Sequence, residues 1–211
     1  MSIVKSLACA LVFACAVPAA NATVITFNDL AGTNVPGNLY YASNTYTSFS
    51  NKAATVDGFI FQSANGSGYI IGPDYTGFSA SSYQPYNGND YYMSYTGFTM
   101  KSADQAAFSV SSLDLANWSS AAFSVTLVGT RTDGTTISQT MSSTIMNNTS
   151  ANDFQTVVLS GFTNLASLQF NSTASFIALD NVVVNAVPEP GSLAMLGLGL
   201  AALAGLRRRK K

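Results

Sequence analysis

The chain has 211 residues, a formal net charge of −1 and no histidine, and charged residues make up only 9% of it. Its two cysteines, Cys9 and Cys15, both stand near the start, and its single glutamate, Glu189, stands near the end. The long region between them therefore lacks the residues for Ser-His-Asp or Cys-His triads, His/Cys zinc sites and thiol chemistry. We expect no catalytic residues, since nothing singles out a pair of aspartates for glycoside hydrolysis.

The N-terminus is typical of a secretory signal peptide. Lys5 precedes an apolar run of eleven residues, Leu7 to Val17, and small residues follow it at Ala20 and Ala22. A positive start, a short apolar run and small residues at the −3 and −1 positions predict cleavage after Ala22. A retained anchor would need a longer apolar span. Removing residues 1–22 also removes both cysteines, so the exported chain has no disulfide.

The middle of the chain, residues 23–186, is acidic. Its nine acids are all aspartates and its only bases are Lys52, Lys101 and Arg131, which gives a formal charge of −6. Nucleic-acid binding is excluded, because it requires a basic surface. An acidic domain is compatible with binding a cation.

The same region predicts an all-β domain. Short apolar segments alternate with turns rich in Gly, Asn, Ser and Thr, and Asp133-Gly134 between two of them indicates a hairpin. The predicted strands are 24–27, 56–62, 69–71, 91–95, 107–110, 112–118, 123–131, 135–141, 154–159, 165–170 and 176–184. Many short strands without disulfides favour one antiparallel β-sandwich or jelly roll, flanked by the signal peptide and a short C-terminal hydrophobic helix.

Tyrosines are confined to one half of this region. All ten lie between Tyr40 and Tyr95, among Asn, Gly and Ser. Their rings either stack on sugars at a binding surface or pack the edge of a loop-rich sandwich with their hydroxyls in water. Trp118 is interpreted as a core residue. No ligand-binding residue can be named from this pattern.

Asp180 interrupts an apolar run that extends from Phe176 to Val184. A run that is apolar at both alternating positions predicts burial on both faces, and a buried carboxylate needs a partner. The partner is a side-chain cation, backbone N–H groups or a bound Ca²⁺; alternatively, the side chain reaches solvent at the strand end.

The stretches ITFNDL at 25–30 and LDNVVV at 179–184 resemble the first and last strands of carbohydrate-binding-module-like jelly rolls. The resemblance implies that the two ends of the domain pair and share a structural calcium ion. It implies Asp29 and Asp180 as ligands, with Asn28 as a further candidate.

The C-terminus has three parts in order. Residues 188–190 read Pro188-Glu189-Pro190, and the apolar stretch 193–206 has no charge. Residues 192–206 are predicted to form a helix, in which the fourteen apolar residues 193–206 span about 21 Å against about 30 Å of hydrocarbon. The five cations that follow stop translocation and stay in the cytoplasm; they are Arg207, Arg208, Arg209, Lys210 and Lys211.

This tail, residues 187–211, resembles the PEP-CTERM sorting signal of Gram-negative bacteria. The resemblance implies recognition by an exosortase after export by the secretion machinery, with transient anchoring by the helix. Release or attachment at the cell surface would follow. A permanent tail anchor is the alternative.

These features predict an exported cell-surface or biofilm-matrix protein that contacts exopolysaccharide. Two alternatives remain: a structural or adhesive protein without a sugar site, and a glycoside-active enzyme using two aspartates.

Overall fold

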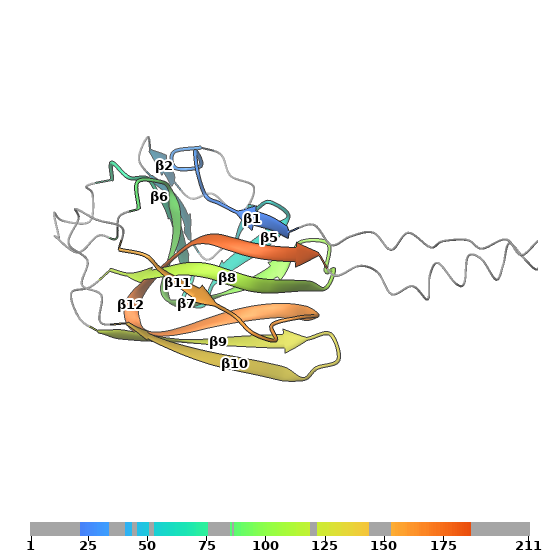
Figure 1. Cartoon of the computed structure of the whole chain (residues 1–211). Coiled ribbons are helices and arrows are strands. Elements are labelled where there is room, and N and C mark those ends of the chain that lie inside the picture. The colour runs from blue at the N-terminus through green and yellow to red at the C-terminus, as the bar shows by residue number, and fades with distance from the viewer. Residues whose placement is uncertain are drawn as a thin grey trace, which may run out of the picture. The chain divides into compact units, whose positions relative to one another are not determined.

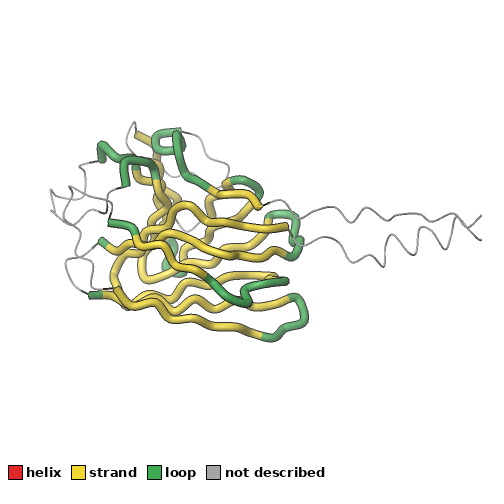
Figure 2. Tube along the Cα trace, in the orientation of Figure 1, coloured by secondary structure: helices red, strands yellow, loops and turns green. Residues whose placement is uncertain are grey.

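A computed structural model describes the middle of the chain, and every regular element in that part is a strand (Figure 2). The described residues are 22–33, 41–43, 46–50, 53–75, 85, 87–118, 122–143 and 153–186. The predicted all-β class is confirmed. The predicted signal peptide, apart from Ala22, and the predicted sorting segment 187–211 lie outside the described residues.

Twelve strands lie in this part of the chain (Figure 1). They are β1 Ala22–Ile25, β2 Tyr41–Ser43, β3 Tyr46–Ser50, β4 Ala53–Val56, β5 Phe59–Ser63, β6 Ser67–Ile71, β7 Tyr91–Ser102, β8 Phe108–Asn117, β9 Phe123–Arg131, β10 Thr136–Ser143, β11 Gln155–Val158 and β12 Leu165–Ala186.

The two longest strands, β7 and β12, fold the sheet into two layers. β7 pairs with β6 through its first half and with β5 through its second half. β12 pairs with β9 up to Ser172, and its register against β7 shifts between Asn171 and Phe176. Beyond that irregularity β12 continues beside β8 and β1. Each long strand therefore belongs to both layers.

The first layer contains β4, β5, the second half of β7, the first half of β12, β9 and β10. The second layer contains β2, β3, β6, the first half of β7, the second half of β12, β8 and β11. There Ala178, Asp180 and Val184 of β12 lie opposite Ala116, Asp114 and Val110, so β8 and β12 run in opposite directions. β1 pairs antiparallel with the end of β12, where Ala22 lies opposite Asn185. This arrangement confirms an antiparallel sandwich.

Gly97 permits the bend in β7. Its φ is +153°, a conformation that L side chains rarely adopt. A Cβ at this position would stand 2.1 Å from the carbonyl oxygen of Phe170 on β12. Only glycine lets the two long strands approach at the corner of the sandwich.

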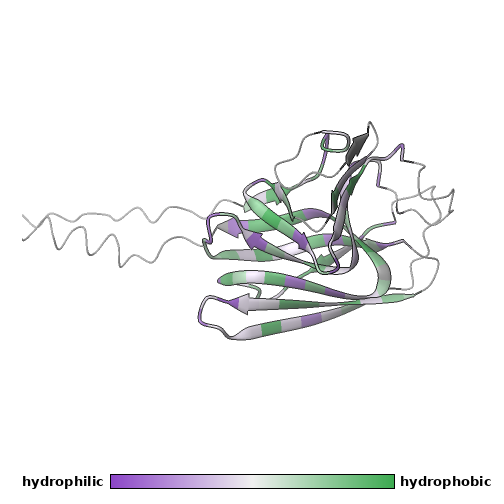
Figure 3. Cartoon of the chain, turned by 180° about the vertical axis from the view of Figure 1, so that it is seen from behind, coloured by the Kyte–Doolittle hydropathy of each residue, from purple (hydrophilic) through white to green (hydrophobic). Residues whose placement is uncertain are grey.

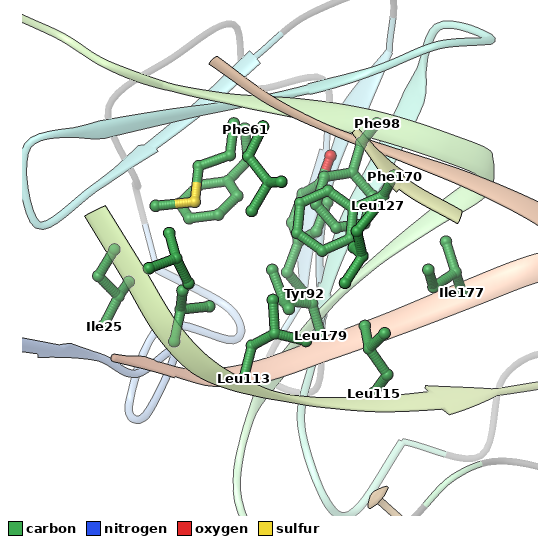
Figure 4. Close-up of a cluster of buried hydrophobic side chains, with 14 of the residues drawn as sticks. Ile25, Phe61, Tyr92, Phe98, Leu113, Leu115, Leu127, Phe170, Ile177 and Leu179 are labelled. Atoms are coloured by element: carbon green, nitrogen blue, oxygen red, sulfur yellow. The ribbon is translucent and has the colours of Figure 1, made fainter. Parts of the chain in front are cut away.

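The main core fills the space between the layers (Figure 4). Phe98 and Phe170 stack with their ring centroids 4.1 Å apart, and Tyr92 meets Phe98 edge-on at 5.1 Å. Along the strands, apolar residues alternate with polar ones (Figure 3), because only one side of each layer faces the core. Each large side chain buried in this way stabilises the fold by roughly 1.5–3 kcal/mol.

Most predicted strands are found, with different bounds. The strands β2 and β3 were not predicted, because their sequences, YAS and YTSFS, are short and rich in Ser, Thr and Tyr and read as a loop. The predicted strand 56–62 coincides mostly with β5, and its first part is the end of β4 and the turn Asp57-Gly58, which has positive φ at both residues. The predicted pairs 107–110 with 112–118, and 165–170 with 176–184, each form one strand, β8 and β12.

The hairpin predicted at Asp133-Gly134 is confirmed. It joins β9 to β10, and the backbone N–H of Arg131 donates to the carbonyl of Thr135 at 2.8 Å. Gly134 has a φ of +84°, and the Asp133 carboxylate accepts from both the backbone and the hydroxyl of Thr135. These hydrogen bonds lower the pKa of Asp133 below its ordinary value.

Candidate functional site

The outer face of the first layer is polar. Thr126 and Thr140 lie opposite each other on β9 and β10, with their hydroxyl oxygens 3.0 Å apart. Gln169 and Asn171 of β12 are exposed in neighbouring rows. This face, which we call the polar face, offers hydroxyl and amide groups on a flat sheet.

The two cations among the described residues also belong to the first layer. Lys101 is exposed on β7, and Arg131 at the end of β9 donates to the carbonyl of Gly161 at 3.0 Å. The second layer has no described cation on its strands, so the two layers differ in charge as well as in polarity.

The outer face of the second layer carries half-buried aromatic side chains, which we call the aromatic face: Tyr46, Tyr69, Tyr95, Trp118 and Phe176. They come from β3, β6, β7, the residue after β8, and β12. Tyr95 and Phe176 are directly opposite each other, with centroids 4.0 Å apart. Trp118 lies 6.1 Å from Phe176, so rings continue across adjacent strands.

Buried tyrosines belong to the same cluster as the rings of the aromatic face. Tyr75 joins Tyr46 and Trp118, with centroid distances of 4.9 and 6.5 Å, and Tyr91 packs edge-on against Phe154 at 5.3 Å. Burial raises the pKa of Tyr75 to about 12, so its hydroxyl stays protonated.

The packing hypothesis is therefore confirmed for some of the tyrosines, although the hydroxyls of Tyr91 and Tyr92 are buried and not in water. Stacking of the other rings on sugars stays a prediction. Tyr75, Tyr91 and Tyr92 are packing residues, whereas Tyr46, Tyr69 and Tyr95 remain partly accessible. Trp118 lies half-buried against this outer cluster instead of in the main core. The sequence did not reveal Phe176 as a member, because its apolar run gives no sign of which face is outward.

Asp180 is fully buried, as the sequence predicts. Its carboxylate accepts hydrogen bonds from the side-chain amide of Asn87 at 2.7 Å, from the backbone of Asn181 at 2.8 Å and from the backbone of Phe27. Burial raises the pKa of Asp180 to about 6, although these hydrogen bonds oppose the shift. The partners are thus N–H groups from three separate segments.

Asp114 lies beside Asp180, directly opposite it on β8. Its two oxygens accept from the hydroxyl of Thr156 at 2.6 Å and from the side-chain amide of Asn181 at 2.9 Å. Asn181, which has a φ of +48°, therefore links the two carboxylates through its backbone and its side chain. The second carboxylate adds to the upward shift in the pKa of Asp180.

The other two predicted calcium ligands lie in an exposed turn. β1 pairs with β12 as the resemblance implies, and Asn28 and Asp29 follow it in the turn after Phe27. The described residues contain no group of three or more His, Cys, Asp or Glu side chains placed to hold a metal ion. Among the residues that lead into this turn, it is Phe27 whose backbone N–H donates to Asp180.

Two hollows lie away from the aromatic face, beside the β4–β5 turn. One, of about 400 Å³, is lined by residues of the β1 end and of this turn, including Asp57. The other, of about 240 Å³, includes Asp57 and Asp104. Hydrogen bonds from Ser102 and Ala106 lower the pKa of Asp104, which makes it a poor general acid.

One known family motif matches the end of the chain. Residues 186–210 match the PEP-CTERM protein-sorting motif. The chain carries a PEP-CTERM sorting signal. This motif includes Pro188, Glu189, Pro190 and most of the basic end, and it implies export, a membrane-anchored precursor and processing by an exosortase. The motif covers the tail alone and assigns no activity to the β domain.

The β domain is weakly similar to solved carbohydrate-binding modules. One, described as "CBM4 structure and function", is 12% identical, with a TM-score of 0.26, over 79% of this chain and 86% of that one. The family 11 carbohydrate-binding module from Clostridium thermocellum is 11% identical, with a TM-score of 0.28, over 75% of this chain and 100% of that one. No curated protein matches the chain in sequence.

Among the described residues, no helix is long and apolar enough to cross a membrane. The hydrophobic helix predicted at 192–206 lies outside those residues, as do Ala20 and the five terminal cations.

Proposed function

We propose that the exported PEP-CTERM protein is a non-catalytic surface or matrix component that binds polysaccharide through the aromatic face. The observation that carries the proposal is the row of half-buried rings across neighbouring strands, with Tyr95, Phe176 and Trp118 in contact. Such rings present apolar surface and, in tyrosine and tryptophan, a polar group at one end. Pyranose rings have the matching combination of apolar C–H faces and hydroxyl edges.

The location of the protein supports the same proposal. A PEP-CTERM signal directs a protein to the outside of the cell, where exopolysaccharide is abundant. The domain has no histidine and no cysteine, and Asp104 is held ionised, so residues suited to acid–base or nucleophilic catalysis are scarce.

The direct test is affinity electrophoresis of the exported protein in native gels that contain neutral or acidic polysaccharides. We expect retardation by at least one polymer and its loss in W118A. Removing a central aromatic contact typically costs about 2 kcal/mol, a roughly thirtyfold weakening. Q169A on the polar face is the matched control and should be retarded like the wild type. Equal retardation of all three proteins, or of none, contradicts the proposal.

A structural or adhesive role is the second candidate, and the polar face favours it. Thr126, Thr140, Gln169 and Asn171 form a flat array without an aromatic ring, suited to contact with protein or mineral. In this case Q169A would weaken adhesion of cells or of coated beads, and W118A would not.

We also propose that a structural calcium ion binds at the paired ends of the domain, with Asp29, Asp180 and Asn28 as the candidate ligands. A melting temperature that rises in saturating calcium and falls in EDTA supports it, because a ligand of the folded state stabilises that state. An unchanged melting temperature rejects it.

A further inference from the structure

Asn87 connects the segment before β7 to Asp180 in the second half of β12. Its side-chain amide donates to Asp180 at 2.7 Å, and its side-chain oxygen accepts from the backbone N–H of Asn89 at 3.0 Å. Three residues further on, Asp90 accepts from the backbone N–H groups of Leu30 and Ala31 at 2.8 and 2.7 Å. The segment 87–90 therefore connects the turn after β1 to β12.

The residue after Asn87 is Gly88, which has a φ of +82°. Glycine leaves the backbone nitrogen unshielded, and asparagine followed by glycine is the sequence in which the side-chain amide is most easily lost. The Gly88 nitrogen attacks Cγ of Asn87 and passes its proton to water. Nδ2 then takes up a proton, the Cγ–Nδ2 bond breaks, and ammonia leaves. Water then opens the cyclic imide to aspartate or isoaspartate.

Two contacts at Asn87 assist this reaction. The N–H of Asn89 points to Oδ1, where negative charge develops as the nitrogen attacks, and a fixed N–H donor stabilises such charge. The Asp180 carboxyl contacts Nδ2, the atom that leaves as ammonia. In the folded protein Nδ2 donates to this carboxylate. Once the Gly88 nitrogen has attacked, Nδ2 is an amine with a free lone pair and can accept a proton from the protonated form of the Asp180 carboxyl.

We propose that Asn87 is a deamidation site of the exported protein, and that its conversion detaches segment 87–90 from Asp180. Deamidation replaces an N–H donor by a carboxylate beside a carboxylate that is already fully buried. The carboxylates nearby are Asp114 on β8 and Asp90 in the segment itself, and no described cation lies in this layer to compensate. Repulsion between like charges in a buried place opens the contact.

A second Asn-Gly pair provides the comparison within the same chain. Asn65-Gly66 lies in the turn between β5 and β6, where Gly66 has a φ of +88° and Asn65 is exposed. Asn65 donates to the hydroxyl of Thr96, also exposed. A carboxylate at residue 65 enters water, so its formation leaves the fold unchanged.

The experiment has two parts, and the first is ageing of the exported protein at neutral pH and 37 °C. Peptide mass spectrometry then measures a mass gain of about 1 Da at residues 87 and 65. We expect the gain to accumulate at residue 87 over days. Its absence at residue 87, while the same protein unfolded in urea acquires it, overturns the proposal.

The second part compares N87D with N65D, each of which reproduces the aspartate product at its site. N87D is expected to melt several degrees below the wild type at neutral pH and to recover as the pH falls and the carboxylates share a proton. N65D is expected to melt like the wild type. Equal melting temperatures of N87D and the wild type overturn the claim that conversion detaches the segment. This holds even if residue 87 gains mass on ageing.

Discussion

At the scale of single residues, Asp180 makes stability depend on pH. Its pKa is raised from 3.8 to about 6, so the folded protein holds a proton that the unfolded chain has already released. The contribution of this group to the free energy of unfolding is therefore complete below about pH 4 and is lost as the pH rises to about 6. A shift of about two pKa units corresponds to at most about 3 kcal/mol. Urea unfolding of the wild type across this range should show the loss, and D180N should not.

Asp104 and Asp133 do not obscure this effect. The pKa values of Asp104 and Asp133 are lowered, so their contributions are present above pH 4 and disappear only in stronger acid. Because both are fully exposed, their effects are also screened by water. Parallel pH profiles for the wild type and D180N would mean that another group titrates in this range.

At the scale of elements, the bend of β7 depends on Gly97. G97A places a methyl group 2.1 Å from the Phe170 carbonyl and imposes an unfavourable φ, so the two layers must separate locally. We expect a loss of about 3 kcal/mol or more, measured by chemical unfolding.

G134A is the matched control for the bend. Gly134 also has a positive φ, but a Cβ there meets nothing within 4 Å. Only the backbone strain remains in G134A, so we expect its free energy of unfolding to fall by about 1 kcal/mol. If G97A and G134A lost similar amounts of stability, the close approach of residue 97 to the Phe170 carbonyl would add nothing to the effect of G97A.

Element prediction from the sequence succeeded where alternation was clear and failed where strands are polar or bent. The β9–β10 hairpin has strict alternation and a glycine turn, so its strands and turn were predictable. β3 contains Thr47, buried because its hydroxyl is hydrogen-bonded to the segment 30–33, a contact that local sequence does not encode. The candidate site was predictable only in part for the same reason. Burial of Asp180 followed from its apolar neighbours, whereas its partner Asn87 lies 93 positions away.

At the scale of the whole molecule, the two predicted processing points flank a domain whose ends are paired. Ala22 begins β1 opposite Asn185, and the last residue of β12, Ala186, lies opposite Phe108. Cleavage after Ala22 leaves Thr23, Val24 and Ile25 paired with β12. A second cut near Pro190 lies beyond the last paired residue. Neither cut removes any core side chain of the described residues, so we expect the processed domain to be as stable as the precursor.

The intact mass of the protein recovered from the cell surface and the medium tests this account of sorting. We expect a chain that starts at Thr23 and ends near Pro190, because the matched PEP-CTERM motif implies exosortase processing. Substituting the motif glutamate, in E189A, should leave the N-terminal cut unchanged and prevent the C-terminal one. The precursor would then remain in the membrane fraction, held by residues 192–206 and the five terminal cations. A wild-type mass that retains residues 191–211 would show that the tail is a permanent anchor. Polysaccharide binding by the aromatic face would then take place at the membrane surface instead of in the matrix.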